Sequence, residues 1–510
     1  MDLNDPAKIY NFKDDIVVFI SVFIWAIIAT LIIQLVILRY IAPSLDDGNG
    51  LLVGGDWGYF HDRAVIVANQ MKMFGWEIWT LKPDKYEAEG VPVGVASAVY
   101  YITGINKPWV LAPVHGFFFA LSALFLYKTS YLISTSKKIS IISILPFVIF
   151  PSAAVIYSQL HKDIYTICGV IIIFFLWCRL GSKIKFNLLE CVFSILLTLI
   201  AFELILIARP YMFPIIFVSC VVGAVVLFLE RKRGTLWWTM LLAYFLISFS
   251  YFYFTDINRL IATSDVPRIQ TEEQKLIIDN GEVNSDNGEV NSDNGEDKIE
   301  YVETGALLER QIALSAFQQN LHDEKAAAQV DNINLPKNTT DVIFAELDNI
   351  FRKYVERVAV TREGFNLTKN AASTIDGHVS FSDFKDIVYY SPRAVQVGFF
   401  APFPDLWFNS SATPGSQLKR FFVGIEMMIS YFLSVGIVLL FIFGKDRIKF
   451  NIAFQALIMV AVFITIYALV ISNVGALYRF RFGAWSMFNA IGIIGWLLLW
   501  RNGRLFPSEQ

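Results

Sequence analysis

Ten stretches of about 20 mostly apolar residues constrain this chain more than any other feature of its sequence. A helix that crosses a bilayer needs a run of about that length. Since 55% of the 510 residues are hydrophobic and only 17% are charged, the composition is that of a polytopic membrane protein rather than of a large soluble core. The sequence therefore predicts an all-α polytopic membrane protein with about ten transmembrane helices. The predicted spans are residues 16–38, 109–133, 140–158, 163–181, 187–208, 211–229, 235–254, 418–443, 449–471 and 482–500.

Lysine and arginine are distributed unevenly over the short loops between these spans. Cytoplasmic loops carry an excess of both residues, and with the N-terminus inside, every short basic loop falls on the inner side. These loops read STSKK, RLGSKIK, ERKRG, GKDRIK and, in the tail, RNGR. The assignment requires that the apolar residues 387–403 do not cross, so we predict an interfacial or re-entrant element there. Both termini are then cytoplasmic, and most of the unusual polar residues lie on the outer face.

Two membrane modules flank a soluble insertion in the predicted organisation. The N-terminal module comprises residues 1–254 and includes a first outer loop at 39–108. A soluble insertion follows at 255–385, and the C-terminal membrane module comprises 386–510. The insertion contains a tandem acidic repeat, NGEVNSD, within residues 280–296. Because such a segment has little apolar surface to bury, we predict that the repeat is disordered and that the rest of the insertion is mainly helical.

Three outer segments are predicted to form helices or apolar packing elements. Residues 58–80 carry apolar side chains at helical spacing and predict a helix on the membrane surface that ends at Gly75. Residues 91–104 are apolar but too short to cross, so we expect them to pack against the spans. Within the insertion, residues 341–360 have the spacing of an amphipathic helix.

Net charge and cysteine placement exclude some classes of function. The formal net charge is −3, and the water-exposed segments contain no basic stripe with interleaved aromatic residues, so no nucleic-acid partner is predicted. The cysteines all lie inside predicted spans, which gives no sign of a disulfide framework or a thiolate metal site. They are Cys168, Cys178, Cys191 and Cys220.

The stretch GGDWGYFHD, residues 54–62, places polar side chains shortly after the first span. Gly54 and Gly55 permit a tight turn, and Asp56 follows them. A carboxylate held there suits a general base that accepts the proton of an attacking hydroxyl, so Asp56 is the predicted catalytic residue. The ordinary alternative is a solvated acid or a helix cap. Further hydrogen-bonding groups for a substrate come from Tyr59, His61 and Asp62.

A second polar cluster is the hairpin YSQLHKD at residues 157–163. Lys162 suits a phosphate as a point charge, and Asp163 suits a helix cap or a metal ligand. His161 completes the set of predicted substrate-binding residues in this hairpin. The alternative is an ordinary loop in which Asp163 only caps the following helix.

Arginines on the predicted outer face form the third group of candidates. Arg209 and Tyr211, in the sequence RPY between two spans, are both predicted to bind substrate, and snorkelling of Arg209 to lipid headgroups is the alternative interpretation. Arg479 and Arg481 occur in NVGALYRFR, against the usual bias of positive charge toward the cytoplasm. Arg393 lies on an apolar element, where an unpaired charge is costly. Guanidinium groups in this position are typical of phosphate binding.

Several of these stretches resemble bacterial C-type glycosyltransferases, which are polytopic enzymes related to protein mannosyltransferases and to transferases that modify lipid A or cell-surface polysaccharides. The resemblance rests on GGDWGYFHDRAVIVA, AVYYITG, FPSAAVIYSQLHKD and NVGALYRFR, and it covers about residues 15–254 and 386–500. It implies that Asp56 acts as the base or orients the acceptor, and that Lys162 and Asp163 hold the donor phosphate. The chain departs from the family pattern where DW replaces a paired acid and where HKD stands in place of a more common Glu.

The function implied by the resemblance is inverting transfer of a sugar from a polyprenyl-phosphate carrier to a cell-surface glycan or lipid acceptor, on the outer face of a bacterial inner membrane. The implied partners are that donor, that acceptor and membrane lipids. The cofactor stays open, with a divalent cation such as Mg²⁺ or Mn²⁺ as the candidate. Two alternatives are an O-antigen or capsule repeat-unit polymerase, which relies on outer-loop arginines, and a transporter or flippase, which usually buries charges at mid-membrane. Glu203 is the clearest charge inside a predicted span.

Overall fold

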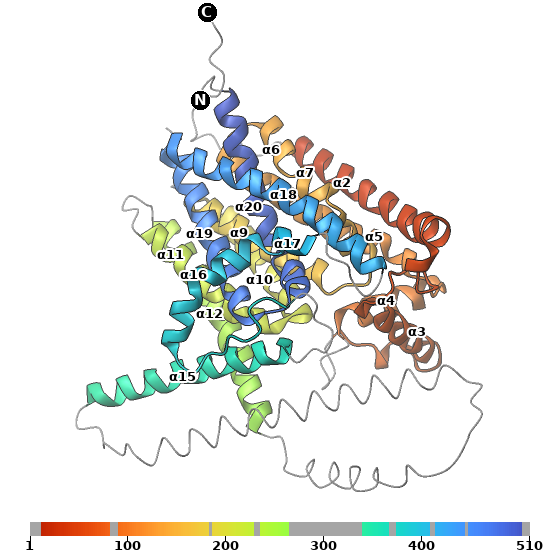
Figure 1. Ribbon diagram of the computed structural model, residues 1–510, viewed down its shortest axis with the longest axis horizontal. Helices are drawn as coiled ribbons and strands as arrows, with labels where there is room; N and C mark the ends of the chain where they lie inside the picture. The colour runs from red at the N-terminus through yellow and green to blue at the C-terminus, as the bar shows by residue number, and fades with distance from the viewer. Residues whose placement is uncertain are drawn as a thin grey trace, which may run out of the picture. The chain divides into compact units, whose positions relative to one another are not determined.

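The computed structural model describes residues 12–81, 90–182, 186–228, 235–264, 339–366, 374–407, 414–443 and 447–501 (Figure 1). Within these ranges every regular element is a helix, and strand-like pairing is limited to two isolated bridges. The predicted all-α class is therefore confirmed. The chain divides into two compact units. Unit 1 comprises Met1–Phe252, Ser391–Ala468 and Val474–Gln510, and unit 2 comprises Tyr253–Tyr390 and Leu469–Asn473.

Nine helices in the described ranges are long and apolar enough to cross a bilayer, so the chain is a multi-pass membrane protein. A helix satisfies its backbone hydrogen bonds internally, as a hydrocarbon environment requires. The elements that form these spans are α2 (Phe12–Ile32) with η1 (Ile33–Ile41), η4 (Pro108–Leu111) with α5 (Ala112–Ser134), α9 (Asp163–Ser182), α10 (Leu188–Ala208), η5 (Pro210–Met212) with α11 (Phe213–Phe228), α12 (Thr235–Ser264), α18 (Pro414–Phe443), α19 (Arg447–Val470) and α20 (Val474–Arg501).

The predicted span at 140–158 is broken rather than straight. Helices α6 (Lys137–Ser143), α7 (Leu145–Ile149) and α8 (Pro151–Ser158) occupy this part of the chain, and the direction changes by 66° between the segment Lys137–Ile149 and α8. Pro151 explains the break, because proline lacks a backbone N–H donor and disfavours helical conformation in the residue before it. Phe150 is accordingly extended, with φ −60° and ψ 138°.

The last predicted span, 482–500, begins earlier than the sequence suggests. Helix α20 starts at Val474, so most of NVGALYRFR, predicted as an outer loop, forms its first two turns. The two arginines in this stretch lower its hydropathy, which explains why the apolar run alone places the start of the helix too late. Arg479 and Arg481 are consequently helical residues whose directions are set by the 3.6-residue period.

Residues 387–403, predicted not to cross, fall in α16 (Phe384–Phe400) and the start of the segment that leads to α17 (Pro404–Trp407). Helix α16 has 17 residues and contains Pro392, and it is not one of the nine span-length helices in the described part of the chain. It is amphipathic, with Ala394, Val397 and Phe399 buried.

Ion pairs identify one end of the helix bundle in unit 1. The Lys128 ammonium lies 2.5 Å from the Asp15 carboxylate, and Lys137 pairs with Asp14. The start of α2, the end of α5 and the start of α6 therefore share this end, which carries the basic loop STSKK. The chain returns toward the opposite end through η1 and η2 (Pro43–Leu45), where the loop after the first span begins.

The loop after the first span, residues 39–108, folds into a small layer with its own core. It contains α3 (Asp56–Phe74), η3 (Gly75–Ile78) and α4 (Val91–Thr103), so the predicted helix at 58–80 and its end at Gly75 are confirmed as α3 and its C-cap. The two helices pack together because each buries one apolar face. The core consists of Leu51, Trp57, Phe60, Ala64, Ala68, Val93, Ala96, Tyr100, Leu111 and Leu160.

Unit 2 contains α15 (Thr339–Asn366), which includes the predicted amphipathic helix at 341–360. Arg362 on this helix is 1% exposed and donates to the carbonyls of Val379, Leu469 and Asp376 at 3.1, 3.0 and 2.9 Å. A single guanidinium thus connects three stretches of the unit through charge-assisted hydrogen bonds. The predicted disordered repeat at 280–296 lies outside the described residues.

Candidate active site

The GGDW turn places Asp56 at the start of α3. Gly54 has φ +82°, in the left-handed region that favours glycine. A Cβ atom on Gly55 would lie 2.2 Å from the Trp57 ring, so the close approach of the indole requires glycine there. Trp57 is 4% exposed and donates its indole N–H to the Leu52 carbonyl. Packing therefore fixes the turn from which Asp56 begins the helix.

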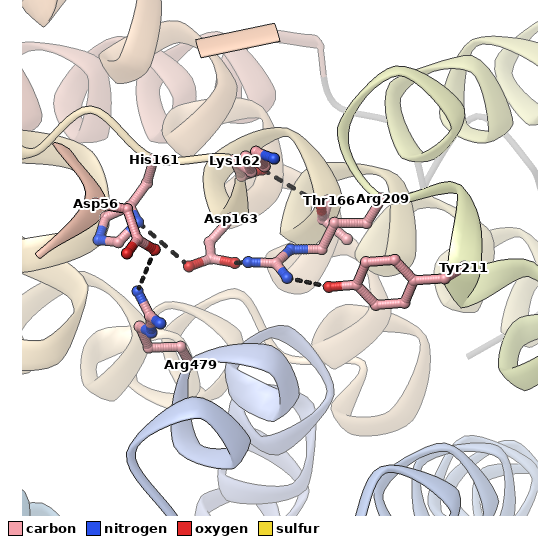
Figure 2. Close-up of polar contacts among 8 residues, drawn as sticks. All are labelled: Asp56, His161, Lys162, Asp163, Thr166, Arg209, Tyr211 and Arg479. Carbon is pink, nitrogen blue, oxygen red and sulfur yellow. Dashed lines mark hydrogen bonds and ion pairs between the residues drawn. The ribbon is translucent and has the colours of Figure 1, made fainter. Parts of the chain in front are cut away.

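Asp56 faces Arg479 of α20 (Figure 2). An Arg479 Nη atom lies 3.9 Å from Asp56 Oδ2, and the two side chains are 26% and 69% exposed. An ion pair this open to solvent contributes less than about 1 kcal/mol to stability. Both groups are therefore able to exchange this contact for one with a substrate.

Asp163 and Arg209 form the buried part of the cluster (Figure 2). Asp163 begins α9, and Arg209 directly follows α10; the Arg209 guanidinium donates to Asp163 Oδ1 at 2.5 Å and also to the Tyr211 hydroxyl. The Asp163 and Arg209 side chains are only 2% and 10% exposed. Burial opposes the charge of Arg209, but the neighbouring Asp163 carboxylate outweighs burial and raises the pKa of Arg209 above its usual value. The guanidinium therefore remains charged.

His161 connects the layer formed by α3 and α4 to this buried pair. Its Nδ1 atom lies 3.4 Å from Asp163 Oδ2, and its ring packs edge-on against Trp57 with 5.0 Å between ring centres. The preceding residue, Leu160, belongs to the core that α3 and α4 share. The position of Asp56 is thus tied to that of Asp163 through packed side chains rather than through a flexible loop.

A cavity adjoins the charged cluster. It is small: apart from the space open to solvent, it has room for about one water molecule. Charged side chains of Asp163, Arg209 and Arg479 line one part of it, and the Arg209 guanidinium carbon lies 3.8 Å from the centre of the Phe480 ring. The remaining lining residues are Thr166, Ile167, Val170, Met212, Phe463, Gly483 and Ala484. The cavity therefore combines two cations and one anion with an apolar wall.

Three predicted substrate-binding residues on α3 lie outside the lining of this cavity. His61 is 3% exposed, its Nδ1 lies 2.9 Å from the Tyr100 hydroxyl, and burial lowers the pKa of His61. His61 therefore packs α3 against α4 and is a structural residue. Tyr59, which is 48% exposed, and Asp62 are surface residues of α3.

Arg481 and Arg393 were predicted to bind phosphate, and the structure gives them other partners. Arg481 is fully buried and donates to backbone carbonyls at the end of α16. Cations stabilise the unpaired carbonyls of a helix C-terminus, so Arg481 holds α16 to α20 instead of joining the cavity. Arg393 donates to Gln396 Oε1 at 2.7 Å. The carbonyls bound by Arg481 belong to Val397, Gly398 and Ala401.

Lys162, predicted to hold phosphate, does not line the cavity, whereas three residues that were not selected from the sequence contribute to the site. The Lys162 ammonium lies 5.4 Å from the centre of the Phe60 ring, and Thr166 donates to the Lys162 carbonyl at 3.2 Å. Trp57 and Phe480 contribute ring contacts to His161 and Arg209. Helical spacing could have identified Thr166, one turn after Asp163, whereas the role of Trp57 depends on a contact with a distant part of the chain.

The cluster does not offer a divalent cation a suitable set of ligands. Among the residues that the structure describes, no group of three His, Cys, Asp or Glu side chains comes together. Arg209 and His161 engage Asp163, and Asp56 faces Arg479. The positive charges that line the cavity belong to Arg209 and Arg479.

The sequence matches no protein-family model and no curated protein. The structure matches no solved structure.

Proposed function

We propose that the chain is a membrane glycosyltransferase that transfers a sugar from a polyprenyl-phosphate carrier to a cell-surface glycan or lipid acceptor. One observation carries the proposal: the exposed carboxylate of Asp56 lies 3.9 Å from Arg479, and Arg479 lines a cavity together with the buried Asp163–Arg209 pair. A base next to a cation that binds phosphate is the arrangement needed to attack a sugar whose leaving group is a phosphate.

The two ion pairs have different roles in this proposal. The Asp163–Arg209 pair is buried and provides a fixed electrostatic framework. The Asp56–Arg479 pair is loose and exposed, so a donor phosphate can take the place of Asp56 at the Arg479 guanidinium. Donor binding then leaves the Asp56 carboxylate available to accept a proton. Lys162, which directly precedes Asp163 in the chain, adds a further positive charge.

The proposed reaction proceeds by a single displacement. Asp56 accepts the proton of the acceptor hydroxyl while the hydroxyl oxygen forms a bond to the sugar C1. The bond from C1 to the phosphate oxygen breaks, and polyprenyl phosphate leaves with the electron pair and one additional negative charge. Arg479 and Arg209 stabilise that charge. Attack opposite the leaving group inverts the configuration at C1.

We place the site on the outer face of a bacterial inner membrane. The basic loop STSKK lies at the end of the bundle where Lys128 and Lys137 pair with the start of α2. Short basic loops remain in the cytoplasm. Asp56 follows the opposite end of that first span and therefore belongs, in this proposal, to the periplasmic or extracellular side.

The proposal is tested with the full chain in lipid nanodiscs and radiolabelled undecaprenyl-phosphate hexoses as probes. Equilibrium binding of the donor and transfer to isolated cell-envelope glycolipids are measured separately. We expect Asp56→Asn to bind donor as the unchanged protein does and to lose transfer about 10²- to 10⁴-fold, the range typical of a lost general base. Arg479→Ala should weaken donor binding itself.

Glu77→Gln is the matched control, because it removes one exposed acid from the same outer loop without touching the cluster. It should leave both binding and transfer unchanged. Donor binding that is absent in the unchanged protein, or insensitive to Arg479→Ala, contradicts the proposal.

A repeat-unit polymerase is the second candidate, favoured by the two arginines that line the cavity. Polymerases of this class act on polyprenyl diphosphate carriers, and a diphosphate has more charge for Arg209 and Arg479 to bind. The surface-polysaccharide ladder of the source cell distinguishes the two. Loss of the long chains with a single repeat unit retained in Arg479→Ala cells favours the polymerase, whereas a missing sugar at unchanged chain length favours the transferase.

A further inference from the structure

Glu426 of α18 is a buried carboxylate that does not line the cavity. It is 1% exposed. Its Oε1 accepts the Ser152 backbone N–H at 2.8 Å, its Oε2 accepts the Ser152 hydroxyl at 2.6 Å, and the Tyr478 hydroxyl donates to the same oxygen. Burial of a carboxylate is costly unless hydrogen bonds compensate it, and three donors do so here. One side chain of α18 thereby binds both α8 and α20.

The contact with Ser152 stabilises the broken span. Ser152 lies in the first turn of α8, immediately after the 66° bend, where backbone N–H groups have no partner within the helix. A carboxylate satisfies one of these groups and is favoured by the helix dipole at this end. At its other end, α8 leads through Gln159 and Leu160 into the loop that carries His161. Glu426 therefore fixes α8, the helix that leads to His161.

The contact with Tyr478 fixes the position of Arg479, the residue that α20 contributes to the cluster. Tyr478 directly precedes Arg479 in the first turns of α20 and is 6% exposed. Its ring also packs on Trp485, with 5.4 Å between ring centres. Holding the Tyr478 hydroxyl sets the rotation and position of the helix turn that presents Arg479.

We propose that Glu426 is a positioning residue that sets the distance between the loop before Asp163 and the start of α20 that carries Arg479. The functional importance of this distance rests on the function proposed above. The geometric part of the proposal has its own readout, because the separation of α8 and α20 is measurable without any activity.

The test measures distances between nitroxide labels by pulsed electron paramagnetic resonance in the full chain in nanodiscs. Labels are attached at Ala154→Cys on α8 and at Gly475→Cys on α20. Ala154 is half-buried and Gly475 is exposed. The four native cysteines, all buried, are replaced by alanine. We expect one narrow distance distribution in this parent protein. Glu426→Ala and Tyr478→Phe should broaden it or shift it, and Ser152→Ala should have a smaller effect because the backbone N–H remains.

Tyr431→Phe is the matched control. It removes a tyrosine hydroxyl from the same helix, α18, where the hydroxyl donates to the Phe400 carbonyl at 2.6 Å, and it leaves all contacts of Glu426 intact. The distribution should stay that of the parent. If Glu426→Ala does not fold, Tyr478→Phe decides the question, since it removes a single hydrogen bond. A parent-like distribution in Tyr478→Phe and in any folded Glu426→Ala protein overturns the proposal.

Kinetics connect the geometry to the proposed reaction. Displacement of Arg479 should raise the donor KM of Tyr478→Phe about tenfold, the size expected when one charge-assisted hydrogen bond to the phosphate is weakened. A variant that only loses folded protein lowers the apparent kcat and leaves KM unchanged. If the unchanged protein transfers no sugar, the proposed function fails, while the label distances still decide the role of Glu426.

Discussion

Arg209 donates to Asp163 at 2.5 Å across two neighbouring helices, and both side chains are buried. Asp163 begins α9 and Arg209 follows α10, so the pair joins the two helices at one end. Snorkelling to lipid headgroups, the ordinary interpretation of an arginine at the end of a span, therefore does not describe Arg209. A buried pair of this kind makes each partner dependent on the other, because removing one leaves the second as an uncompensated charge.

The first prediction concerns this pair. Asp163→Asn and Arg209→Gln should each reduce the free energy of unfolding by about 3–5 kcal/mol, and the double variant by less than the sum. Thermal unfolding in detergent measures the three values. The pair Lys137 and Asp14, whose side chains are 49% and 32% exposed, provides the control, with an expected coupling below about 1 kcal/mol. Additive losses at Asp163 and Arg209 would contradict the prediction.

A second prediction separates stability from activity at Asp56. Because its side chain is 69% exposed and its pair with Arg479 is loose, Asp56→Asn should change the free energy of unfolding by less than about 1 kcal/mol. The same substitution should abolish most sugar transfer, since an amide cannot accept the proton. Unfolding midpoints and transfer rates are measured on the same preparation. A fully active Asp56→Asn protein would show that Asp56 is not the base.

Much of the fold follows from the sequence because a bilayer admits few backbone solutions. Runs of about 20 apolar residues predict spanning helices without knowledge of their partners. The start of α20 is an informative error: Arg479 and Arg481 interrupt the apolar run, and only tertiary contacts reveal that the helix extends through them. Arg481 is accommodated by carbonyls at the end of α16, which no local pattern indicates.

The candidate site could be predicted as a list of residue types but not as a set of contacts. Asp56, Asp163 and Arg479 all occur in polar stretches next to apolar runs, which the sequence shows directly. Which cations meet which acids depends on how the helices pack. Arg209 and Arg481 look alike in the sequence, yet one lines the cavity and the other supports the backbone of α16. Trp57, whose ring contacts His161, has no local signal for this role.

A third prediction concerns the GGDW turn. Gly55→Ala places a Cβ atom 2.2 Å from the Trp57 ring, so the indole has to move from its position against His161. Overpacking of this kind should cost about 1–3 kcal/mol and should also lower transfer, because Asp56 moves with the turn. Gly58→Ala is the control: the nearest atom to its Cβ is Asp47 Oδ2 at 3.3 Å, and alanine favours a helix. Equal stability of the two variants would contradict the proposed role of Trp57 packing.

The last prediction is a pH dependence that originates at His61. In the unfolded chain this imidazole binds a proton below its ordinary pKa of 6.5, whereas burial lowers the pKa of His61 in the folded protein. The contribution of the neutral imidazole to stability is therefore complete above about pH 6.5 and is lost as the pH falls from there toward the lowered pKa. Melting temperatures between about pH 7.5 and pH 5.5 should consequently fall more steeply for the unchanged protein than for His61→Gln, which has no titrating group at this position but keeps a hydrogen-bond partner for Tyr100. Parallel pH profiles for the two proteins would mean that His61 does not become protonated on unfolding in this range.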